Sequence, residues 1–292
     1  MCTAVFSKNK LPLFGRNLDL EYHYSESVVI VPQKFPFRFG KLPENHNHFS
    51  IIGTAFVQSG YPLFYDGMNE KGLCAAALNF PKSAVYLPER EGFYNVASFE
   101  IIPFVLSSCS DISEAKELLL RTNVTDFAFS KKLSPTPLHW IFSDKTGSIA
   151  AEPTGKGLEI YDNPANVLAN EPPLPAHLEN LREDFAFKSR IFENLSSEER
   201  FVKAFFAKEK ADFYGDPISQ FFQILSSVGK ISLEKGSQKT VYSCCFDMEK
   251  LVYYYRTYEN SRTNAVHLSK KFPGKELFPY PLNFENDIFY QN

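Results

Sequence analysis

The sequence lacks any long hydrophobic run, because charged residues or prolines interrupt each apolar stretch before it could cross a bilayer. Residues 1–10 contain neither the basic start nor the apolar stretch of an export signal. We therefore expect a cytoplasmic protein that does not insert into membranes.

An excess of charge of one sign is also missing. Lys and Arg number 31, Asp and Glu number 34, and the formal net charge is -3 with both signs spread along the chain. Proteins that bind nucleic acids present a basic patch to the phosphate backbone. Since the sequence offers no such patch, we expect no nucleic acid partner.

Cysteine is scarce, with 5 residues at irregular spacing and no Cys-x-x-Cys pair. This pattern indicates neither a disulfide framework nor a structural zinc site. His46 and His48 stand in a polar stretch that is typical of a loop, and a metal site there is not favoured. The cysteines are Cys2, Cys74, Cys109, Cys244 and Cys245. Cys74, Cys244 and Cys245 lie in apolar runs, where cysteine usually acts as a small core residue.

No linker rich in Pro, Ser or Gly, no low-complexity block and no internal repeat divides the chain. With 292 residues, of which 44% are hydrophobic, the chain is long enough to bury a large core. We predict a single domain over residues 1–292.

Short β-rich runs dominate the first half of the chain and return after residue 138 and near the C-terminus. Each run is bounded by polar or turn residues and is too short for a helix. The predicted strands are residues 4–7, 13–18, 28–31, 51–57, 73–78, 138–142, 148–151, 158–161, 166–169, 240–246 and 251–255. Residues 66–72 have hairpin-turn chemistry, and the tail from Phe272 onward is expected to be irregular.

Good helix formers gather in blocks between these runs. They predict helices over residues 96–106, 113–121 and within 175–210. Another helix is predicted to begin with Asp216 as N-cap and Pro217 at the first helical position. Hairpin meanders interleaved with helical blocks favour an α+β fold of mainly antiparallel sheets covered by helices.

Cys2 directly follows the initiator Met1. Removal of Met1 would leave a thiol and a free α-amino group on one residue, which places a nucleophile beside a base. An ordinary α-amino group titrates near about 7.7 to 8.0, so part of it can accept a proton at neutral pH. The alternative is that Cys2 is simply an early residue of the chain.

Arg16 and Asp19 close the second predicted strand, and a hairpin would return them to the vicinity of Cys2. A guanidinium can stabilise a thiolate, and a carboxylate can hold an amine through a charge-assisted hydrogen bond. Strand periodicity puts the two side chains on opposite faces, so the strand must bend or end near Leu18 for both to serve one site. The alternative is a surface ion pair of little consequence.

Several short motifs follow one another in the chain. They are Met1-Cys2-Thr3, residues 14–19 (FGRNLD), residues 66–73 (DGMNEKGL), residues 78–81 (LNFP), residues 138–140 (LHW) and residues 253–260 (YYYRTYEN). In this order they resemble the choloylglycine hydrolases, a family that includes bile salt hydrolases and penicillin V acylases, and the resemblance runs from residue 1 to about residue 265. The resemblance implies an N-terminal-nucleophile hydrolase with a four-layer αββα sandwich, in which two mainly antiparallel sheets are flanked by helices.

The same resemblance assigns roles to individual residues. It implies that Cys2 is the nucleophile, with Arg16 and Asp19 as its immediate partners and with Asn79 and Asn170 as the oxyanion-hole pair. A reaction of this type needs no metal or cofactor. Positions that resemble the substrate pocket of the family hold Leu18, Tyr24, Phe129, Leu133 and Leu138.

A sixth catalytic position in the family is an arginine before an apolar helix, and Arg200 matches it best, with Arg190 as the competitor. In relatives a long segment before this arginine helps to assemble tetramers. Here the segment between Asn170 and Arg200 is short and charged, so the sequence leaves a homo-oligomer open and does not favour a tetramer.

Asn79 resembles the bile-salt branch of the family, because penicillin-preferring relatives tend to carry Tyr at that position. We therefore expect a small-molecule amide, a bile acid conjugated to glycine or taurine, as the substrate. The alternatives are penicillin V, an N-acyl homoserine lactone, or an inactive homologue that only binds ligands.

Overall fold

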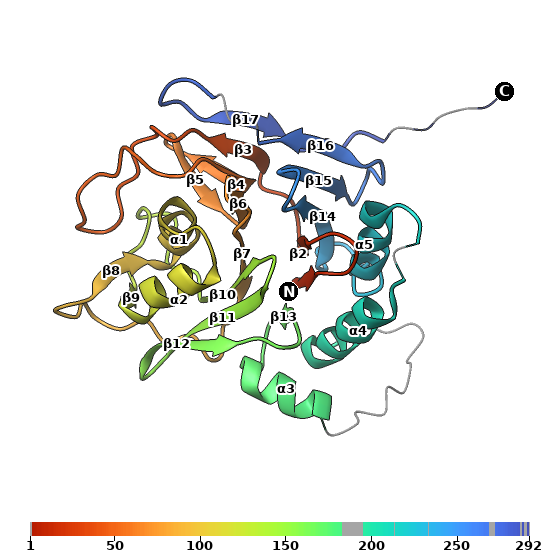
Figure 1. The fold of residues 1–292 in the computed structure, drawn as a ribbon, viewed down its shortest axis with the longest axis horizontal. Coiled ribbons are helices and arrows are strands. Elements are labelled where there is room, and N and C mark those ends of the chain that lie inside the picture. Colours follow the sequence, from red (N-terminus) through yellow and green to blue (C-terminus); the bar gives the residue numbers. More distant parts are fainter. Residues whose placement is uncertain are drawn as a thin grey trace.

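The computed structural model has two large β-sheets with helices on their outer faces (Figure 1). Arg190 lies outside the described residues. These are residues 2–182, 195–212, 214–232, 234–268, 272–286, 288 and 291.

The first sheet carries the N-terminus and has six antiparallel strands in the order β13-β1-β2-β14-β15-β16. Their bounds are β13 (Val167–Ala169), β1 (Cys2–Ser7), β2 (Leu13–Leu20), β14 (Lys239–Asp247), β15 (Val252–Thr257) and β16 (Asn264–His267). The strand that begins at Cys2 thus lies inside the sheet, with a hydrogen-bonded neighbour on either side.

The second sheet has nine strands. Eight of them follow the order β12-β11-β10-β7-β6-β4-β3-β17, and the ninth, β5, pairs with β4 outside this order. Their bounds are β12 (Gly157–Asp162), β11 (Gly147–Thr154), β10 (Leu138–Asp144), β7 (Cys74–Asn79), β6 (Asp66–Asn69), β4 (Ile51–Gln58), β3 (Ser27–Val31), β17 (Phe278–Pro281) and β5 (Tyr61–Phe64). All of its strand pairs are antiparallel.

The two sheets pack face to face, and β7 shows how the layers arise. Cys74, Ala76 and Leu78 belong to the core that β7 shares with the first sheet, whereas Ala75 and Ala77 belong to the core beneath the helices of the second sheet. Since successive side chains of a strand point to opposite faces, a continuous apolar run can serve both cores. This strand is buried on both faces.

Two pairs of helices complete the layers. In Figure 1, α1 (Ile101–Ser108) and α2 (Ile112–Leu120) cover the second sheet, and α4 (Ser197–Lys210) and α5 (Pro217–Ser226) cover the first. A further helix, α3 (Leu174–Arg182), contacts α4. The predicted α+β fold, a four-layer αββα sandwich, is confirmed. No helix among the described residues is both long and apolar enough to span a bilayer.

Side-chain caps mark the starts of two helices, and one of these caps was predicted. Asp216 accepts a hydrogen bond from the backbone of Ser219, and Pro217 opens α5, as the sequence indicated. Ser196 and Glu199 form a reciprocal capping box at the start of α4. The helix predicted over residues 113–121 corresponds to α2.

Three local predictions were wrong. The helix predicted over residues 96–106 does not begin at residue 96, because residues 96 and 97 belong to β8 (Tyr94–Ala97). This strand pairs in parallel with β9 (Thr122–Thr125), and a 3₁₀ turn then leads into α1. The first part of the 66–72 turn is the strand β6. The tail contains β17, whose two prolines are tolerated because β17 is an edge strand.

Candidate active site

The β1–β2 hairpin brings Cys2 opposite Leu18 at the first paired position of β1. Cys2 is 3% exposed, and its side chain lines a cavity of about 390 Å³ whose walls come from both sheets and from the loops around residues 98–99 and 129–136. Such a volume lies within the range of about 300 to 1,000 Å³ that is usual for small-molecule sites. The thiol is therefore packed into the protein on one side and opens into a ligand-sized space on the other.

Arg16 is completely buried on β2, two residues before Leu18. Its Nη1 donates to the carbonyl oxygens of Tyr65 at 2.9 Å and Ala77 at 2.7 Å, both in the second sheet or beside it. Its Nη2 has no hydrogen-bond partner among the described residues. Burial opposes the charged guanidinium, but neighbouring ionisable groups, with Cys2 first among them, outweigh burial and raise the pKa of Arg16. Arg16 is thus a fixed cation beside the thiol.

Asp19 is equally buried, and its Oδ1 accepts a hydrogen bond of 2.7 Å from the hydroxyl of Thr240. Burial raises the pKa of this carboxyl group, whereas the Thr240 hydroxyl and the positive charges of Arg200 and Lys230 act in the opposite direction. The carboxylate therefore lies on the side of the first sheet that α4 covers.

Of the two possibilities, that β2 bends or that it ends near Leu18, the structure excludes the second, since the strand continues to Leu20. The partner strand β14 carries a register irregularity between Thr240 and Tyr242, opposite this part of β2. Arg16 bonds to the second sheet while Asp19 interacts with Arg200 on α4, so the two side chains stay on opposite faces. Cys2 stands at the end of β1, so its thiol and its backbone nitrogen have different neighbours. Arg16 and Asp19 can therefore belong to one site although they lie on opposite faces of the sheet.

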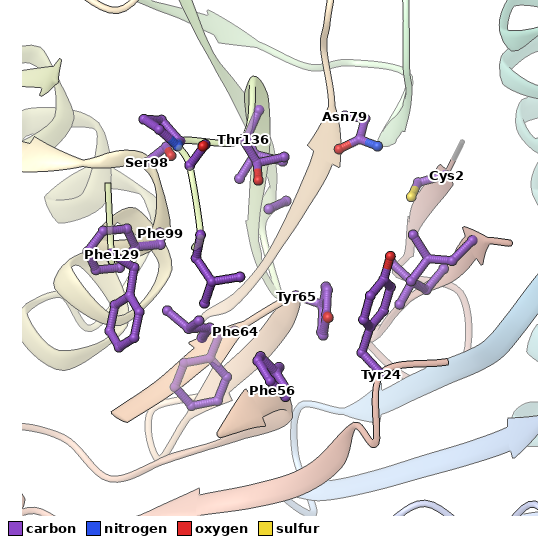
Figure 2. A pocket seen from close by; sticks show the side chains of 18 residues that line it. Cys2, Tyr24, Phe56, Phe64, Tyr65, Asn79, Ser98, Phe99, Phe129 and Thr136 are labelled. Atoms are coloured by element: carbon purple, nitrogen blue, oxygen red, sulfur yellow. The ribbon is translucent and has the colours of Figure 1, made fainter. Parts of the chain in front are cut away.

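Asn170 connects Cys2 to the second sheet. The backbone nitrogen of Cys2 donates to Oδ1 of Asn170 at 2.5 Å, and Nδ2 of Asn170 donates to the carbonyl of Asn79 at 2.7 Å. An amide nitrogen carries two donor hydrogens, and the second N–H of Asn170 has no acceptor among the described residues. Asn79 also lines the cavity with Cys2 (Figure 2).

Arg200 joins the same cluster from α4. Its Nη2 donates to Oδ1 of Asn170 at 2.9 Å and to the carbonyl of Cys2 at 3.4 Å, and its Nε donates to the hydroxyl of Thr3 at 3.1 Å. Burial lowers the pKa of Arg200, although attraction to Asp19 and Cys2 works against this effect. The structure thus brings Cys2, Arg16, Asp19, Asn79, Asn170 and Arg200 together around one chain end.

The sequence did not single out three further members of this cluster. Thr240 and Thr3 hold Asp19 and Arg200 through their hydroxyl groups. Lys230 is 7% exposed, and burial together with the like charge of Arg200 lowers its pKa. The direction of the Thr3 side chain could have been predicted from the sequence, since successive side chains of a strand alternate and Thr3 must face away from Cys2. Thr240 and Lys230 reach the site only through long-range pairing.

The cavity beside Cys2 has mostly apolar walls. All five residues expected in the substrate pocket line it, and they are joined by Phe56, Phe64 and Phe99. Figure 2 shows Cys2 and Asn79 on one side of this space and Phe99 and Phe129 on the far side. The expected five are Leu18, Tyr24, Phe129, Leu133 and Leu138. A thiol at one end and an aromatic wall at the other suit a ligand with a large apolar part.

Comparison with known proteins gives consistent matches. The family model described as linear amide C–N hydrolases, choloylglycine hydrolase family, matches residues 2–190 and 189–272. A bile salt hydrolase/transferase from Lactiplantibacillus plantarum is 39% identical over 100% of both chains. A conjugated bile acid hydrolase from Lactobacillus gasseri is 32% identical over 87% of this chain and 92% of its own length.

Solved structures give the same picture. A mutant conjugated bile acid hydrolase from Clostridium perfringens superposes with a TM-score of 0.90 at 32% identity, and each chain is covered to 100%. Penicillin V acylase from Agrobacterium tumefaciens shares the fold, with a TM-score of 0.73 at 17% identity over 92% of this chain and 86% of its own. The chain therefore belongs to the choloylglycine hydrolase family of linear amide C–N hydrolases.

Proposed function

We propose that this protein hydrolyses the amide bond of bile acids conjugated to glycine or taurine. The observation that carries the proposal is the position of Cys2, which lies at the wall of a mostly apolar cavity beside a buried cation. Relatives named bile salt hydrolase/transferase or conjugated bile acid hydrolase support the same substrate class.

The proposed reaction begins after removal of Met1, when Cys2 has a free α-amino group. The amine takes the proton of the thiol, and the thiolate attacks the carbonyl carbon of the substrate amide. Arg16 stabilises the thiolate, while Asp19 and the oxygen of Asn170 orient the ammonium group that forms. The contact between the Cys2 nitrogen and Asn170 supports this arrangement.

The tetrahedral intermediate then carries a negative charge on the former carbonyl oxygen. In the proposal, the remaining side-chain N–H of Asn170 and the backbone of Asn79 stabilise this charge. The ammonium group gives its proton to the leaving nitrogen, so glycine or taurine departs and a thioester to Cys2 remains. A water molecule, activated by the same amine, attacks the thioester and releases the free bile acid.

Arg200 is proposed to act on the geometry of the site. It bonds at once to Asn170 and to the carbonyl of Cys2, which ties the nucleophile to the oxyanion residue. We assign the sixth catalytic position of the family to Arg200, because its hydrogen bonds reach Cys2 and Asn170. Arg190 lies outside the described residues.

A substrate panel tests the proposal. The purified protein and its Cys2→Ala variant are incubated with glycocholate, taurocholate, penicillin V and a long-chain N-acyl homoserine lactone, and the released amines are measured. We expect the wild-type protein to cleave the two bile salts fastest and the variant to cleave none of the four.

Other results would favour the alternatives. Faster cleavage of penicillin V or of the lactone would assign the enzyme to that substrate. Ligand binding without cleavage of any of the four would indicate a homologue that only binds, and would overturn the proposed function.

The proposed location is the cytoplasm. All five cysteines are free thiols, which fits a compartment that keeps thiols reduced. Cell fractionation with antibodies to the protein tests this location, and recovery from the culture medium would contradict it.

A further inference from the structure

Asn79 and Asn170 come from different parts of the fold and yet must act at one point. Asn79 ends β7 in the second sheet, and Asn170 follows β13 at the edge of the first. Their direct contact is a single hydrogen bond from the amide of Asn170 to the carbonyl of Asn79. An oxyanion hole depends on donors held in place before the reaction, so the separation of these two segments matters.

The residue after Asn170 bridges this gap. Oε1 of Glu171 accepts hydrogen bonds from the backbone nitrogens of Lys82 at 2.8 Å and Ser83 at 3.0 Å, and Oε2 accepts one of 2.7 Å from the hydroxyl of Ser83. Lys82 and Ser83 lie in the turn that follows Asn79. Both carboxylate oxygens of Glu171 thus hold the segment that carries the other asparagine.

Buried contacts also connect the segment that carries Asn79 to the segment that follows Asn170. The ring of Phe80, next to Asn79, stacks on His139 with ring centroids 4.2 Å apart. Nδ1 of His139 lies 3.1 Å from Oε1 of Glu152, which also accepts a hydrogen bond from the backbone of Leu174. His139 and Glu152 are completely buried, so replacing them would endanger the fold. Glu171 is only half-buried and is the tie that can be removed.

We propose that Glu171 is a positioning residue, which fixes the segment after Asn79 against the segment of Asn170 and so sets the geometry of the oxyanion hole. This inference rests on the proposed function, in which the two asparagines stabilise the oxyanion. Glu171 is not among the residues that line the cavity. Its effect must therefore appear in kcat and leave KM almost unchanged.

The test compares Glu171→Ala with Glu171→Gln on glycocholate, or on whichever substrate of the panel the wild-type protein cleaves. The alanine variant loses all three hydrogen bonds, and we expect its kcat to fall about tenfold. The glutamine oxygen can accept both backbone N–H groups, and its amide can donate to the hydroxyl of Ser83. We therefore expect Glu171→Gln to retain kcat within about threefold of the wild-type value.

Alkylation of Cys2 by iodoacetamide separates positioning from a general loss of structure. Alkylation consumes the thiolate but forms no oxyanion, so its rate does not depend on the oxyanion hole. In Glu171→Ala we expect the rate of Cys2 modification, followed by peptide mass, to stay within about twofold of wild type. A merely structural role would change this rate together with kcat.

Glu70→Ala is the matched control. Glu70 is also half-buried and accepts hydrogen bonds from the backbone and the hydroxyl of Ser50, but it lies in the turn before β7, at the opposite end of that strand from Asn79. We expect this variant to keep the wild-type kcat.

Two results would overturn the positioning role. One is an unchanged kcat in Glu171→Ala, and the other is a fall in kcat that is matched by the alkylation rate or by Glu70→Ala. If the wild-type protein cleaves no substrate of the panel, the proposed function fails, and the positioning role fails with it. If it cleaves one and Glu171→Ala does so equally well, only the positioning role fails.

Discussion

The backbone nitrogen of Cys2 lies 2.5 Å from Oδ1 of Asn170, a residue 168 positions further along the chain. Strand pairing produces this contact, because Thr3 stands opposite Ala169 in the register of β1 and β13. The next residues at this end of the antiparallel pair are Cys2 and Asn170. The group proposed as the catalytic base therefore has a fixed partner that the sheet itself supplies.

Asn170→Ala removes this partner and the proposed oxyanion donor together. We expect kcat for glycocholate to fall about 10² to 10³-fold, the range seen when one oxyanion donor is lost. Asn163→Ala is the control, since Asn163 is a buried asparagine that bonds to the carbonyl of Val167. Its loss should lower the melting temperature without a comparable loss of kcat. Equal losses of kcat in the two variants would argue against a direct role for Asn170.

Arg16→Met tests the buried cation. The variant keeps an unbranched but shorter side chain without the guanidinium. The carbonyl of Ala77 then loses its donor from Arg16, and the carbonyl of Tyr65 keeps only the backbone N–H of Ala77. We expect the free energy of unfolding in urea to fall by about 3 kcal/mol, and alkylation of Cys2 at neutral pH to become slower because the thiolate loses its cation.

Arg38→Met is the control for this variant. Arg38 forms an exposed ion pair with Glu44, and its removal should change the free energy of unfolding by no more than about 0.5 kcal/mol. Alkylation of Cys2 at the wild-type rate in Arg16→Met would show that the guanidinium does not act on the thiol.

Asp19→Asn should make the protein more stable and less active. Burial raises the pKa of Asp19, so the folded state binds more protons than the unfolded state above the usual carboxyl pKa of about 3.9. The stability of the wild-type protein therefore falls as pH rises from about 4 through the raised pKa of Asp19. Urea unfolding should show little difference between variant and wild type below about pH 4, and a growing advantage of the variant above it.

Asp111→Ala provides a control of opposite sign. Asp111 caps α2, and the hydrogen bond from the backbone of Glu114 lowers its pKa. Its contribution to stability is present above the unfolded pKa and is lost as pH falls, so this variant should be less stable at neutral pH.

A wild-type stability profile in Asp19→Asn would contradict the assignment of a raised pKa. We also expect kcat/KM of Asp19→Asn to fall at least about tenfold, because the amine loses a charged partner.

Phe129→Ala tests the apolar wall of the cavity. Loss of an aromatic contact worth about 1 to 2 kcal/mol should raise KM for glycocholate roughly 5- to 30-fold and leave kcat almost unchanged. Phe127, two residues earlier, is 42% exposed and does not line the cavity, so Phe127→Ala should behave like the wild-type protein. If both variants had the wild-type KM, the acyl group would have to bind elsewhere.

The sequence predicted the parts of the fold that depend on neighbouring residues. The hairpin that carries Cys2 and Arg16 followed from two short apolar runs joined by a polar turn, and α5 followed from Asp216 and Pro217. The parallel pair β8–β9 was missed because its partners are far apart in sequence and Val96 also suits the start of a helix. The strand β17 was missed because its prolines suggest irregular structure.

In the candidate site, too, the sequence predicted what depends on neighbouring residues and missed what depends on distant ones. Cys2, Arg16 and Asp19 could be grouped from their places on one hairpin, whereas Asn79, Asn170 and Arg200 came only from the family resemblance. No local pattern predicts that Thr240 would pair with Asp19 across 221 positions, or that Glu171 would hold the turn after Asn79. These contacts depend on strand register and on packing between layers, which a single sequence does not encode locally.

The central claim is that Cys2, with its α-amino group freed by the loss of Met1, cleaves conjugated bile acids. The most direct test measures the intact mass of the protein and, on the same preparation, the release of glycine from glycocholate, with Cys2→Ala as the comparison. We expect a mass that lacks Met1, glycine release by the wild-type protein, and no release by the variant. Glycine release by protein that retains Met1, or equal release by Cys2→Ala, would contradict it.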